Sequence, residues 1–559
     1  MNIMSVRKRP SPGGRRHRQL AKGHVLTFDE QTTRREFLQQ LAVLLYGLGA
    51  SSGLSLSQNL EALAADGIKL KSDVKLLPWT GDDFTLGHRM RNSEIPKFPA
   101  ATERNIDFVI VGGGMAALAA AHNLKNHDYL LLEQYEQTGG NARGANSRGL
   151  WYSYGSQYLT EIDGDVGQII ADLKLKPVKV GTEKNAWWDG SRFLKGVDNG
   201  TNAIYKDFKR MKSEMKSIWS KMGNATMYVS DLTPELEKLD KVLLSTMLTG
   251  YSAPFMELIE GFMKASACGG VNNLSALSGL SVLEDLVIPS YLLEGGNPAL
   301  TRAIAENIKK TTPQRIVTNA FVWSVNLKDD GASVVYQDKS GTLHRVNCKH
   351  VIIAVSPMIA ARIVNLKVPD KAQMYAIRYG SYLVGNFILS KKVFNSSFDN
   401  WLPAKYSFPD ITIANTVYDL NGHYKKEMGQ VLTVYQPYAA GSEGRSLLLE
   451  GSRDKFSLQL RKQLAGILGK EFDAALETVQ LSRWGHAMAV TGPDYFKRMK
   501  KVLSGQTNSF SYAHSSYHGL PAAESAIRGG RVAAQRALKM RKSKAQMFGP
   551  MPYPTNSTT

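Results

Sequence analysis

The chain has 559 residues, of which 43% are apolar, and it carries a formal net charge of +20. This length and apolar content suit two or three folded domains and exclude general disorder. The only two cysteines, Cys268 and Cys348, stand in no Cys-x-x-Cys or Cys/His cluster, which argues against a zinc or iron–sulfur site. They could form one disulfide or remain buried as free thiols.

Basic residues are concentrated at both ends of the chain. Residues 1–35 hold nine Lys or Arg and two acids, and residues 528–544 hold seven Lys or Arg and no acid. Such charge favours acidic partners or peripheral contact with an anionic membrane, although charge scattered over a soluble enzyme also accounts for it. No nucleic-acid-binding module is recognisable, so we expect no nucleic-acid partner.

The first apolar run follows a pair of arginines. Arg34 and Arg35 precede apolar residues that continue to Ala50, a run shorter than the roughly 20 residues of a membrane-spanning helix. The stretch resembles a twin-arginine (Tat) export signal, with Ala62-Leu63-Ala64 as a cleavage site. The resemblance implies Tat export machinery as a partner and a periplasmic protein, released by cleavage or tethered to the membrane. An amphipathic helix with a chance arginine pair is the alternative.

Residues 65–104 are polar and contain several prolines, which indicates a lead-in arm. Residues 203–223 predict an amphipathic helix that packs on a core or, alternatively, lies on a membrane surface. Residues 234–266 also have a helical pattern. The apolar face of the first helix consists of Ile204, Phe208, Met211, Met215, Ile218 and Met222.

The later part of the chain turns to strands. Residues 315–357 contain three β-rich runs separated by Asp-Gly and Ser-Gly turns, and residues 380–440 are β-rich as well. Residues 521–540 return to a helical pattern.

A glycine-rich motif stands between a predicted strand and a predicted helix. Gly112, Gly114 and Ala117 fit G-x-G-x-x-A directly after the apolar strand Phe108–Val111. The glycines permit a tight turn and a close approach to a pyrophosphate, which the helix N-terminus then faces. Glu133 ends the next strand, where its carboxylate can accept hydrogen bonds from an adenosine ribose. The motif predicts a dinucleotide site.

A second glycine pair follows this acid. Gly139 and Gly140 stand six residues after Glu133, and Asn141 and Arg143 follow them. This order resembles the flavin-containing amine oxidase superfamily, in which the second pair lets the chain pass close to FAD. An arginine usually follows the pair in that family, whereas this chain has Asn141 there.

Further segments resemble the same family in the same order. They are Gly155-Ser156-Gln157, which resembles the segment beside the flavin ring, Val322 in the strand that meets the adenine, and Glu524 and Ala526 in the C-terminal helix that faces the flavin. The resemblance implies bound FAD and an α/β fold of two domains, a Rossmann-type FAD domain and a mixed α+β substrate domain.

We assign the parts of the chain accordingly. The expected order is a Tat-type signal segment (1–64), the arm (65–104), a discontinuous FAD-binding domain (105–160, 290–365 and 480–545), a substrate domain (161–289 and 366–479) and a tail (546–559).

The implied chemistry is oxidation of a small-molecule amine by hydride transfer to flavin N5, with oxygen or a redox carrier as the electron acceptor. Such a reaction depends on orientation more than on acid–base groups. Trp484 is a candidate wall of the site, and His486 and His518 are candidates that could titrate near neutral pH and take a proton. The segment around Trp484 beside a twin-arginine signal resembles the bacterial spermidine dehydrogenase group.

Three departures from the family pattern weaken a monoamine-oxidase-like reading. Met488 and Leu520 stand near the positions of the family's aromatic cage, and Tyr379–Phe387 lacks the lysine that many members place beside the flavin. A dehydrogenase that passes electrons to a carrier stays open. A basic surface does not suit free polyamines well. A flavin desaturase or isomerase of a lipid-like substrate and a non-catalytic FAD-binding assembly factor are the alternatives.

Overall fold

The computed structural model describes residues 70–196, 200, 204–223, 228–403, 405–441 and 443–547. The twin-arginine stretch, its cleavage site and most of the predicted tail lie outside these residues. Contacts divide the chain into residues 1–63 and residues 64–559, and the following description concerns the second unit.

The first sheet is mainly parallel and carries the glycine-rich turn. Its strand order is β11-β4-β3-β14-β13-β12, with β20 beside β14. The strands β11, β4, β3, β14 and β20 run parallel, whereas β14, β13 and β12 form an antiparallel meander. The bounds are β3 Arg104–Val111, β4 Tyr129–Leu132, β11 Ile316–Val317, β12 Phe321–Lys328, β13 Gly331–Gln337, β14 Leu343–Ile353 and β20 Phe510–Tyr512.

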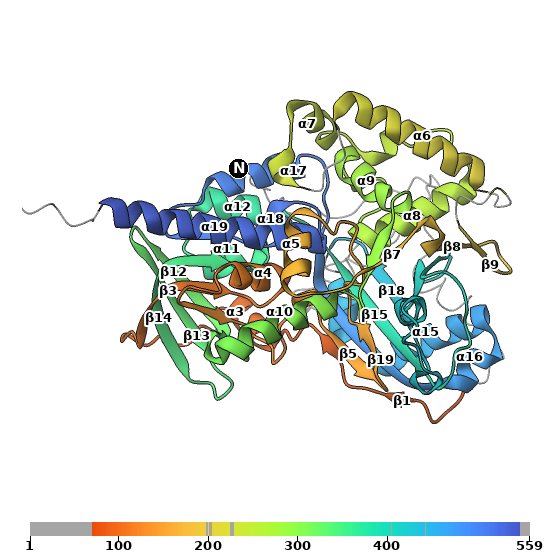
Figure 1. The fold of residues 1–559 in the computed structure, drawn as a ribbon, viewed down its shortest axis with the longest axis horizontal. Helices are drawn as coiled ribbons and strands as arrows, with labels where there is room; N and C mark the ends of the chain where they lie inside the picture. Colours follow the sequence, from red (N-terminus) through yellow and green to blue (C-terminus); the bar gives the residue numbers. More distant parts are fainter. Residues whose placement is uncertain are drawn as a thin grey trace, which may run out of the picture. The chain divides into compact units, whose positions relative to one another are not determined.

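Helices α4 (Met115–Asn123) and α19 (Ala523–Met547) lie against each other beside this sheet (Figure 1). The alanine-rich α4 is buried along almost its whole length. A Cβ added at Gly530 of α19 would stand 2.2 Å from the carbonyl oxygen of Ala116 in α4. The two backbones therefore approach more closely than any side chain at position 530 would permit.

The second sheet contains strands from the lead-in arm, the middle and the C-terminal part of the chain. Its order is β1-β19-β15-β18-β17-β16-β8-β9, with β2 beside β19. The bounds are β1 Lys75–Leu76, β2 Thr80–Gly81, β8 Asn185–Trp188, β9 Phe193–Lys195, β15 Tyr379–Leu389, β16 Asp399–Trp401, β17 Asp410–Ile413, β18 Gln430–Tyr438 and β19 Leu476–Ala489.

The amphipathic helix of the sequence is α6 (Tyr205–Met222), and its apolar face is buried in the core. The helical pattern over residues 234–266 corresponds to two helices, α7 (Pro234–Asp240) and α8 (Ala253–Ala267). Gly250 has a positive φ of 71° and Pro254 is the second residue of α8, so the backbone turns between Gly250 and the start of this helix.

The remaining elements connect these parts. The helices are α3 Thr85–Arg91, α5 Gly164–Asp172, α9 Ala276–Leu283, α10 Asn297–Thr311, α11 Pro357–Ile363, α12 Val368–Tyr375, α13 Thr416–Leu420, α14 Glu443–Glu450, α15 Arg453–Leu468, α16 Lys470–Ala475, α17 Tyr495–Ser504 and α18 Ser515–His518, and the strands are β5 Gly144–Ser147, β6 Leu150–Ser153, β7 Val178–Val180 and β10 Ser290–Leu292.

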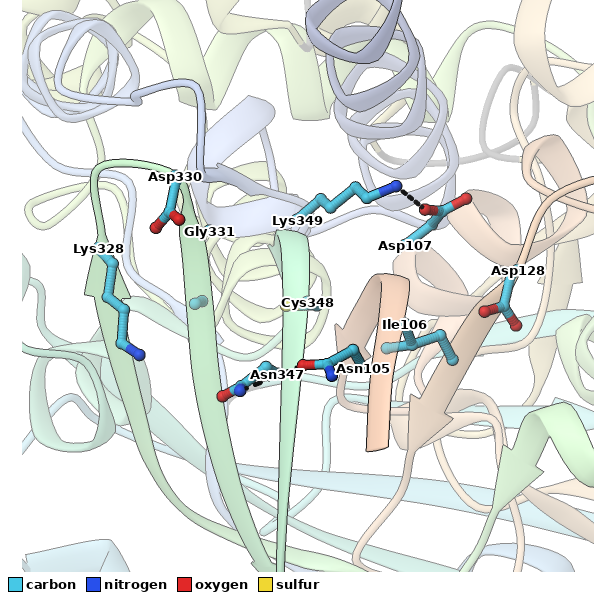
Figure 2. Close-up of a pocket in the computed structure, with 11 residues that line it drawn as sticks. Asn105, Ile106, Asp107, Asp128, Lys328, Asp330, Gly331, Asn347, Cys348 and Lys349 are labelled. Atoms are coloured by element: carbon cyan, nitrogen blue, oxygen red, sulfur yellow. Dashed lines mark hydrogen bonds and ion pairs between the residues drawn. The ribbon is translucent and has the colours of Figure 1, made fainter. Parts of the chain in front are cut away.

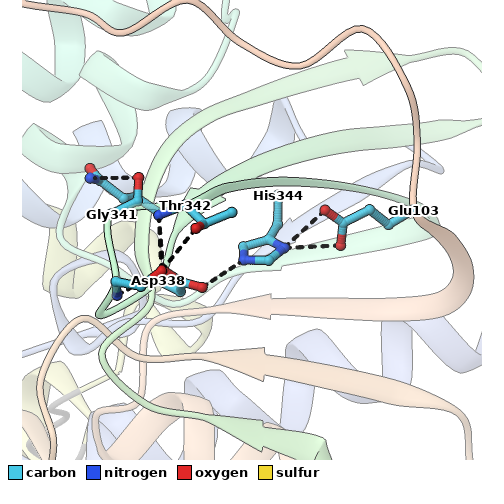
Figure 3. A network of polar contacts seen from close by, with 7 residues as sticks. Glu103, Asp338, Gly341, Thr342 and His344 are labelled. Atoms are coloured by element: carbon cyan, nitrogen blue, oxygen red, sulfur yellow. Dashed lines mark hydrogen bonds and ion pairs between the residues drawn. The ribbon is translucent and has the colours of Figure 1, made fainter.

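The predicted lead-in arm has regular structure. Its strands β1 and β2 add to the edge of the second sheet, parallel to β19, and α3 follows them. Glu103, near the end of the arm, contacts His344 of β14, whose other ring nitrogen lies 2.9 Å from Asp338 (Figure 3). The arm is thus attached to both sheets.

Both cysteines are buried and free. Within the described ranges, no helix combines the length and apolar character required to cross a membrane.

Candidate FAD and active site

The two glycine-rich segments come together at the carboxyl ends of β3 and β4. Gly112 has a φ of 105°, and Gly139 and Gly140 have φ values of 127° and 58°, conformations that favour glycine. Gly139 N–H donates to the carbonyl of Gly113 at 2.7 Å. A Cβ at Gly114 would meet only the Cα of Gly140, at 3.8 Å, so open space lies in front of this backbone.

The acid of the motif is held close to the same turn. Glu133 is buried after β4, and its Oε1 accepts a 2.8 Å hydrogen bond from the Tyr135 N–H. Burial raises the pKa of Glu133, which the hydrogen bond from Tyr135 and the charge of Arg143 oppose. A Cβ at Gly113 would stand 2.6 Å from Glu133 Oε2, so only glycine fits between this acid and the turn.

These features fit a dinucleotide such as FAD. Open backbone at Gly114, the N-terminus of α4 and a buried carboxylate at the end of β4 would hold the pyrophosphate and the ribose. Ala117 is fully buried in α4. Val322 is the second residue of β12 and stands two residues after Ala320, whose N–H donates to the carbonyl of Glu133 at 2.7 Å.

Arg143 and Asn141 connect the glycine pair to the second sheet. The Arg143 guanidinium donates to the Gly81 carbonyl at 2.6 Å and stacks 4.1 Å from the Tyr135 ring. Asn141 Nδ2 donates to the carbonyl of Ala487 in β19 at 2.9 Å. Arg143 therefore holds the arm in place.

The segment from Ser153 to Gln157 lies against one face of the second sheet. Three side chains of neighbouring strands donate hydrogen bonds to three successive carbonyls of this segment. They are Asn386 Nδ2 to Ser153 at 3.1 Å, Trp484 Nε1 to Tyr154 at 2.9 Å and the Tyr435 hydroxyl to Gly155 at 2.6 Å. The predicted flavin segment is thus aligned by β15, β19 and β18.

The remaining predicted residues of this segment have partners as well. Ser156 Oγ accepts a 2.7 Å hydrogen bond from Asn297 of α10. Gln157 Nε2 lies 3.5 Å from Thr412 Oγ1 of β17. Both side chains are therefore fixed by groups on other elements.

The C-terminal helix begins beside the end of the same segment. Glu524 is buried, and its Oε1 accepts a 2.7 Å hydrogen bond from the N–H of Thr160. Burial raises the pKa of Glu524. Ala526 is buried two positions further along the first turn of α19.

The two candidate histidines differ from the expectation that they titrate near neutral pH. His518 is 8% exposed, its Nε2 lies 2.8 Å from the carbonyl of Tyr512, and burial lowers its pKa to about 4. The His486 side chain is partly open to solvent. Desolvation by the surrounding protein, together with the charges of Arg445 and Arg362, nevertheless lowers its pKa to about 4. Tertiary contacts that the local sequence does not reveal therefore lower the pKa of both histidines.

Trp484, the predicted aromatic residue of the site, is accompanied by two further aromatic rings. Trp484 is buried with the Arg143 guanidinium 5.3 Å from its ring centre. Tyr382 and Tyr435 stand edge to face with ring centres 6.4 Å apart. Neither Tyr435 nor Asn386 stands in a sequence motif that could have identified it as a residue of the site.

Asp82 of the arm is another residue that sequence reasoning missed. Its Oδ2 accepts a 2.7 Å hydrogen bond from the N–H of Gly485, next to His486. Burial raises the pKa of Asp82, opposed by this hydrogen bond and by Arg143. The polar sequence around Asp82 contains no signal that could identify Gly485, 403 residues away, as its partner.

A separate hollow of about 460 Å³ lies at the amino ends of β3 and β4 (Figure 2). Asn105 and Asp128 line it, and Lys349 forms a 2.8 Å ion pair with Asp107 at its rim. Parallel sheets bind ligands at the carboxyl ends of their strands, so this hollow is distinct from the glycine-rich site.

The fold and the glycine-rich site define the class of FAD-dependent oxidoreductases. A family model described as flavin containing amine oxidoreductase matches residues 115–538, about three quarters of the chain. The chain belongs to this family, and FAD is its cofactor. The predicted two-domain α/β fold is confirmed, whereas the domain boundaries and the individual site residues stay predictions.

The names of the proteins similar to this chain point to several different substrates. L-amino-acid oxidase of Crotalus adamanteus is 26% identical over 314 residues, which are 53% of this chain and 60% of that protein. Solved structures of putrescine oxidase bound to putrescine (18% identity, TM-score 0.60) and cyclohexylamine oxidase from Brevibacterium oxydans (15%, 0.61) each align over 78% of this chain and 99% of theirs. A fatty acid isomerase from P. acnes (13%, 0.57) aligns over 77% and 98%. These structures share the fold.

Proposed function

We propose that this chain is an exported FAD-dependent oxidoreductase that oxidises an amine by hydride transfer to flavin N5. The observation that carries the proposal is the position of Ser153–Gln157, which continues from the glycine-rich site and is hydrogen-bonded to a polar, aromatic face of the second sheet. Family membership supports the same chemistry.

Bound FAD supplies the acceptor for the hydride equivalent. The residues of the chain supply orientation and exclude water. Trp484, Tyr435 and Asn386 fix the backbone beside which the substrate carbon must lie, because displacement of a reacting centre by about 1 Å costs a large part of the rate.

Anaerobic mixing of the purified holoenzyme with a panel of amines tests this proposal. At least one primary or secondary amine should bleach the oxidised flavin absorption. If no amine bleaches the flavin while an unsaturated fatty acid is isomerised or desaturated, the lipid alternative replaces amine oxidation. The fold shared with the fatty acid isomerase is the reason to include fatty acids in the test. A flavin that neither amines nor lipids reduce would favour the assembly-factor alternative.

The electron acceptor and the location are further parts of the proposal. Strand β15, which includes the buried Val384, contains no lysine. This absence favours a redox carrier over oxygen as the electron acceptor. Export rests on Arg34 and Arg35 ahead of a short apolar run. Replacement of both arginines by lysine should retain the protein in the cytoplasm, and mass spectrometry of the mature N-terminus should identify cleavage near Ala64.

A further inference from the structure

We infer that Asp399 and Asp410 form a subsite for a second cationic group, so that the substrate is a diamine or polyamine instead of a monoamine. This inference rests on the proposed oxidation of an amine. The two acids lie on the sheet face that contacts the flavin segment.

The register of the strands places both acids on one face. Asp399 of β16 is the pairing partner of Thr412 in β17, and Asp410 stands two residues before Thr412. Because side chains two residues apart on a strand point to the same side, Asp399, Asp410 and Thr412 share a face. Thr412 in turn lies beside Gln157 of the flavin segment.

Neither acid is fully satisfied by the protein, although the backbone N–H of Asn400 donates to Asp399. Each is 4% exposed, and its Oδ1 has no hydrogen-bond partner. Asn185, the parallel partner of Asp399 in β8, is 1% exposed and has an unpartnered Nδ2 in the same region. Among the described side chains, no Lys, Arg or His forms an ion pair with either acid. A buried carboxylate oxygen without a partner is costly, so this arrangement favours a ligand that brings a cation.

The nearby cation of the protein is already engaged. Lys184 forms a 3.0 Å ion pair with Asp285 and a hydrogen bond to Ser290, and its ammonium lies 5.3 Å from the Tyr158 ring centre. The Tyr158 hydroxyl donates to the other oxygen of Asp285 at 2.6 Å. Lys184 therefore pairs directly with Asp285, and among the described side chains neither Asp399 nor Asp410 has an ion pair of its own.

The electrostatics agree with this geometry. Burial raises the pKa of Asp399, with Lys184 opposing and Asp285 adding to the shift. Burial and the charge of Asp399 raise the pKa of Asp410. Tyr158, Tyr382 and Tyr435 are the other titratable groups that face the pair. A bound ammonium would stabilise the ionised acids and release protons to solvent.

The subsite is joined to the reacting end through Tyr435. Its hydroxyl donates to the Gly155 carbonyl, and the charges of Asp410 and Asp399 act on the same ring. A diamine with its reacting nitrogen at the flavin segment would extend along this face of the sheet toward the acids. The distal ammonium keeps its proton, whereas the reacting amine must be neutral.

The test measures binding to the holoenzyme after reduction with dithionite, since the reduced enzyme cannot turn over. Calorimetric titration compares 1,4-diaminobutane with n-butylamine, which has the same carbon chain and one nitrogen. The wild type should bind the diamine about tenfold or more tightly, with proton release. D399N and D410N should each weaken diamine binding by about 10- to 100-fold, the range of a charged hydrogen bond, and leave butylamine within about twofold.

Asp419→Asn is the matched control, because Asp419 is an exposed acid paired with Lys392 and should leave both affinities unchanged. Equal wild-type affinities for the two amines would overturn the inference, as would variants that weaken both amines equally. The wild-type comparison decides the question even if the variants fail to fold.

The outcomes separate this inference from the proposed function. If butylamine and diaminobutane bind equally but both bleach the oxidised flavin, the subsite fails and amine oxidation stands. If diamine binding depends on Asp399 and Asp410 but no amine reduces the flavin, the subsite stands and the proposed oxidation fails.

Discussion

The Tyr435 hydroxyl donates a 2.6 Å hydrogen bond to the carbonyl of Gly155, across the boundary between the two sheets. Gly155 belongs to the segment that continues from the FAD motif, and Tyr435 belongs to β18 of the second sheet. A single side chain thus couples the face that would hold the substrate to the backbone that would face the flavin.

Tyr435→Phe should slow flavin reduction by an amine while FAD content is retained. The variant loses one hydrogen bond, worth about 0.5–1.5 kcal/mol, which corresponds to roughly a 2- to 12-fold lower rate. Stopped-flow reduction under anaerobic conditions measures this. Tyr438→Phe is the control, since Tyr438 lies three residues further on β18, points to the opposite face of the sheet and packs in an apolar cluster. Equal rates in the two variants would contradict the positioning role.

Gly114→Ala and Gly112→Ala should fail in different ways. A Cβ at Gly114 meets almost nothing in the protein, so the apoprotein should keep its stability, but the methyl group enters the space before the turn and should weaken FAD binding about tenfold or more. Gly112 has a φ of 105°, and a Cβ there would stand 2.8 Å from the Ala354 carbonyl oxygen. Gly112→Ala should therefore lower the free energy of unfolding by about 1–2 kcal/mol or more.

Flavin absorbance per protein and thermal unfolding of the apoproteins distinguish the two glycine variants. A Gly114→Ala protein with wild-type FAD content would show that the cofactor does not approach this turn.

The ion pairs of His344 should make thermal stability depend on pH. Partial burial opposes protonation of His344, but hydrogen bonds from its ring to Asp338 and Glu103 outweigh this effect and raise its pKa (Figure 3). Because the folded-state pKa is the higher one, this stabilisation is fully present below the unfolded value of about 6.5 and is lost as the pH rises through the folded-state value.

His344→Gln provides the measurement. The difference in Tm between wild type and His344→Gln should be largest near pH 6, shrink toward pH 9 and decrease with added salt, because these groups are partly exposed. A difference that grows with pH would contradict the assignment of a charged His344.

The two thiols should resist modification in the folded protein. Cys268 and Cys348 are buried, and burial raises the pKa of Cys348 to about 12 and that of Cys268 further still. Since the thiolate is the reactive form, labelling by a disulfide reagent should be about 1,000-fold slower than for an exposed cysteine. In guanidinium chloride both thiols should react at once. Rapid labelling of the native holoenzyme would disprove the burial of at least one thiol.

Local sequence signals predicted the cofactor side of the site. Gly112, Gly114, Gly139 and Gly140 each need a backbone conformation or a close approach that only glycine provides, so their positions can be read from the chain without tertiary information. The break within 234–266 was also readable, since Gly250 and Pro254 mark it.

The substrate side could not be predicted in the same way. Asp399 and Asp410 occupy short strands with no motif, and only the register of β16 and β17 brings them to one face. The same limit explains the error on His518, whose pKa depends on burial beneath α19 and not on its neighbours in sequence.

The attachment of the arm has a consequence for the order in which the protein can be completed. Thr80 of β2 hydrogen-bonds Ser482 of β19, and the two residues are 402 positions apart. At about 5–20 residues per second, a ribosome needs roughly 20–80 s to synthesise the chain between them. During that time β1 and β2 have no strand to pair with, and Asp82 has no Gly485 to bind. The edge of the second sheet is therefore among the last parts to form, although β1 and β2 are made before every other strand that the structure describes.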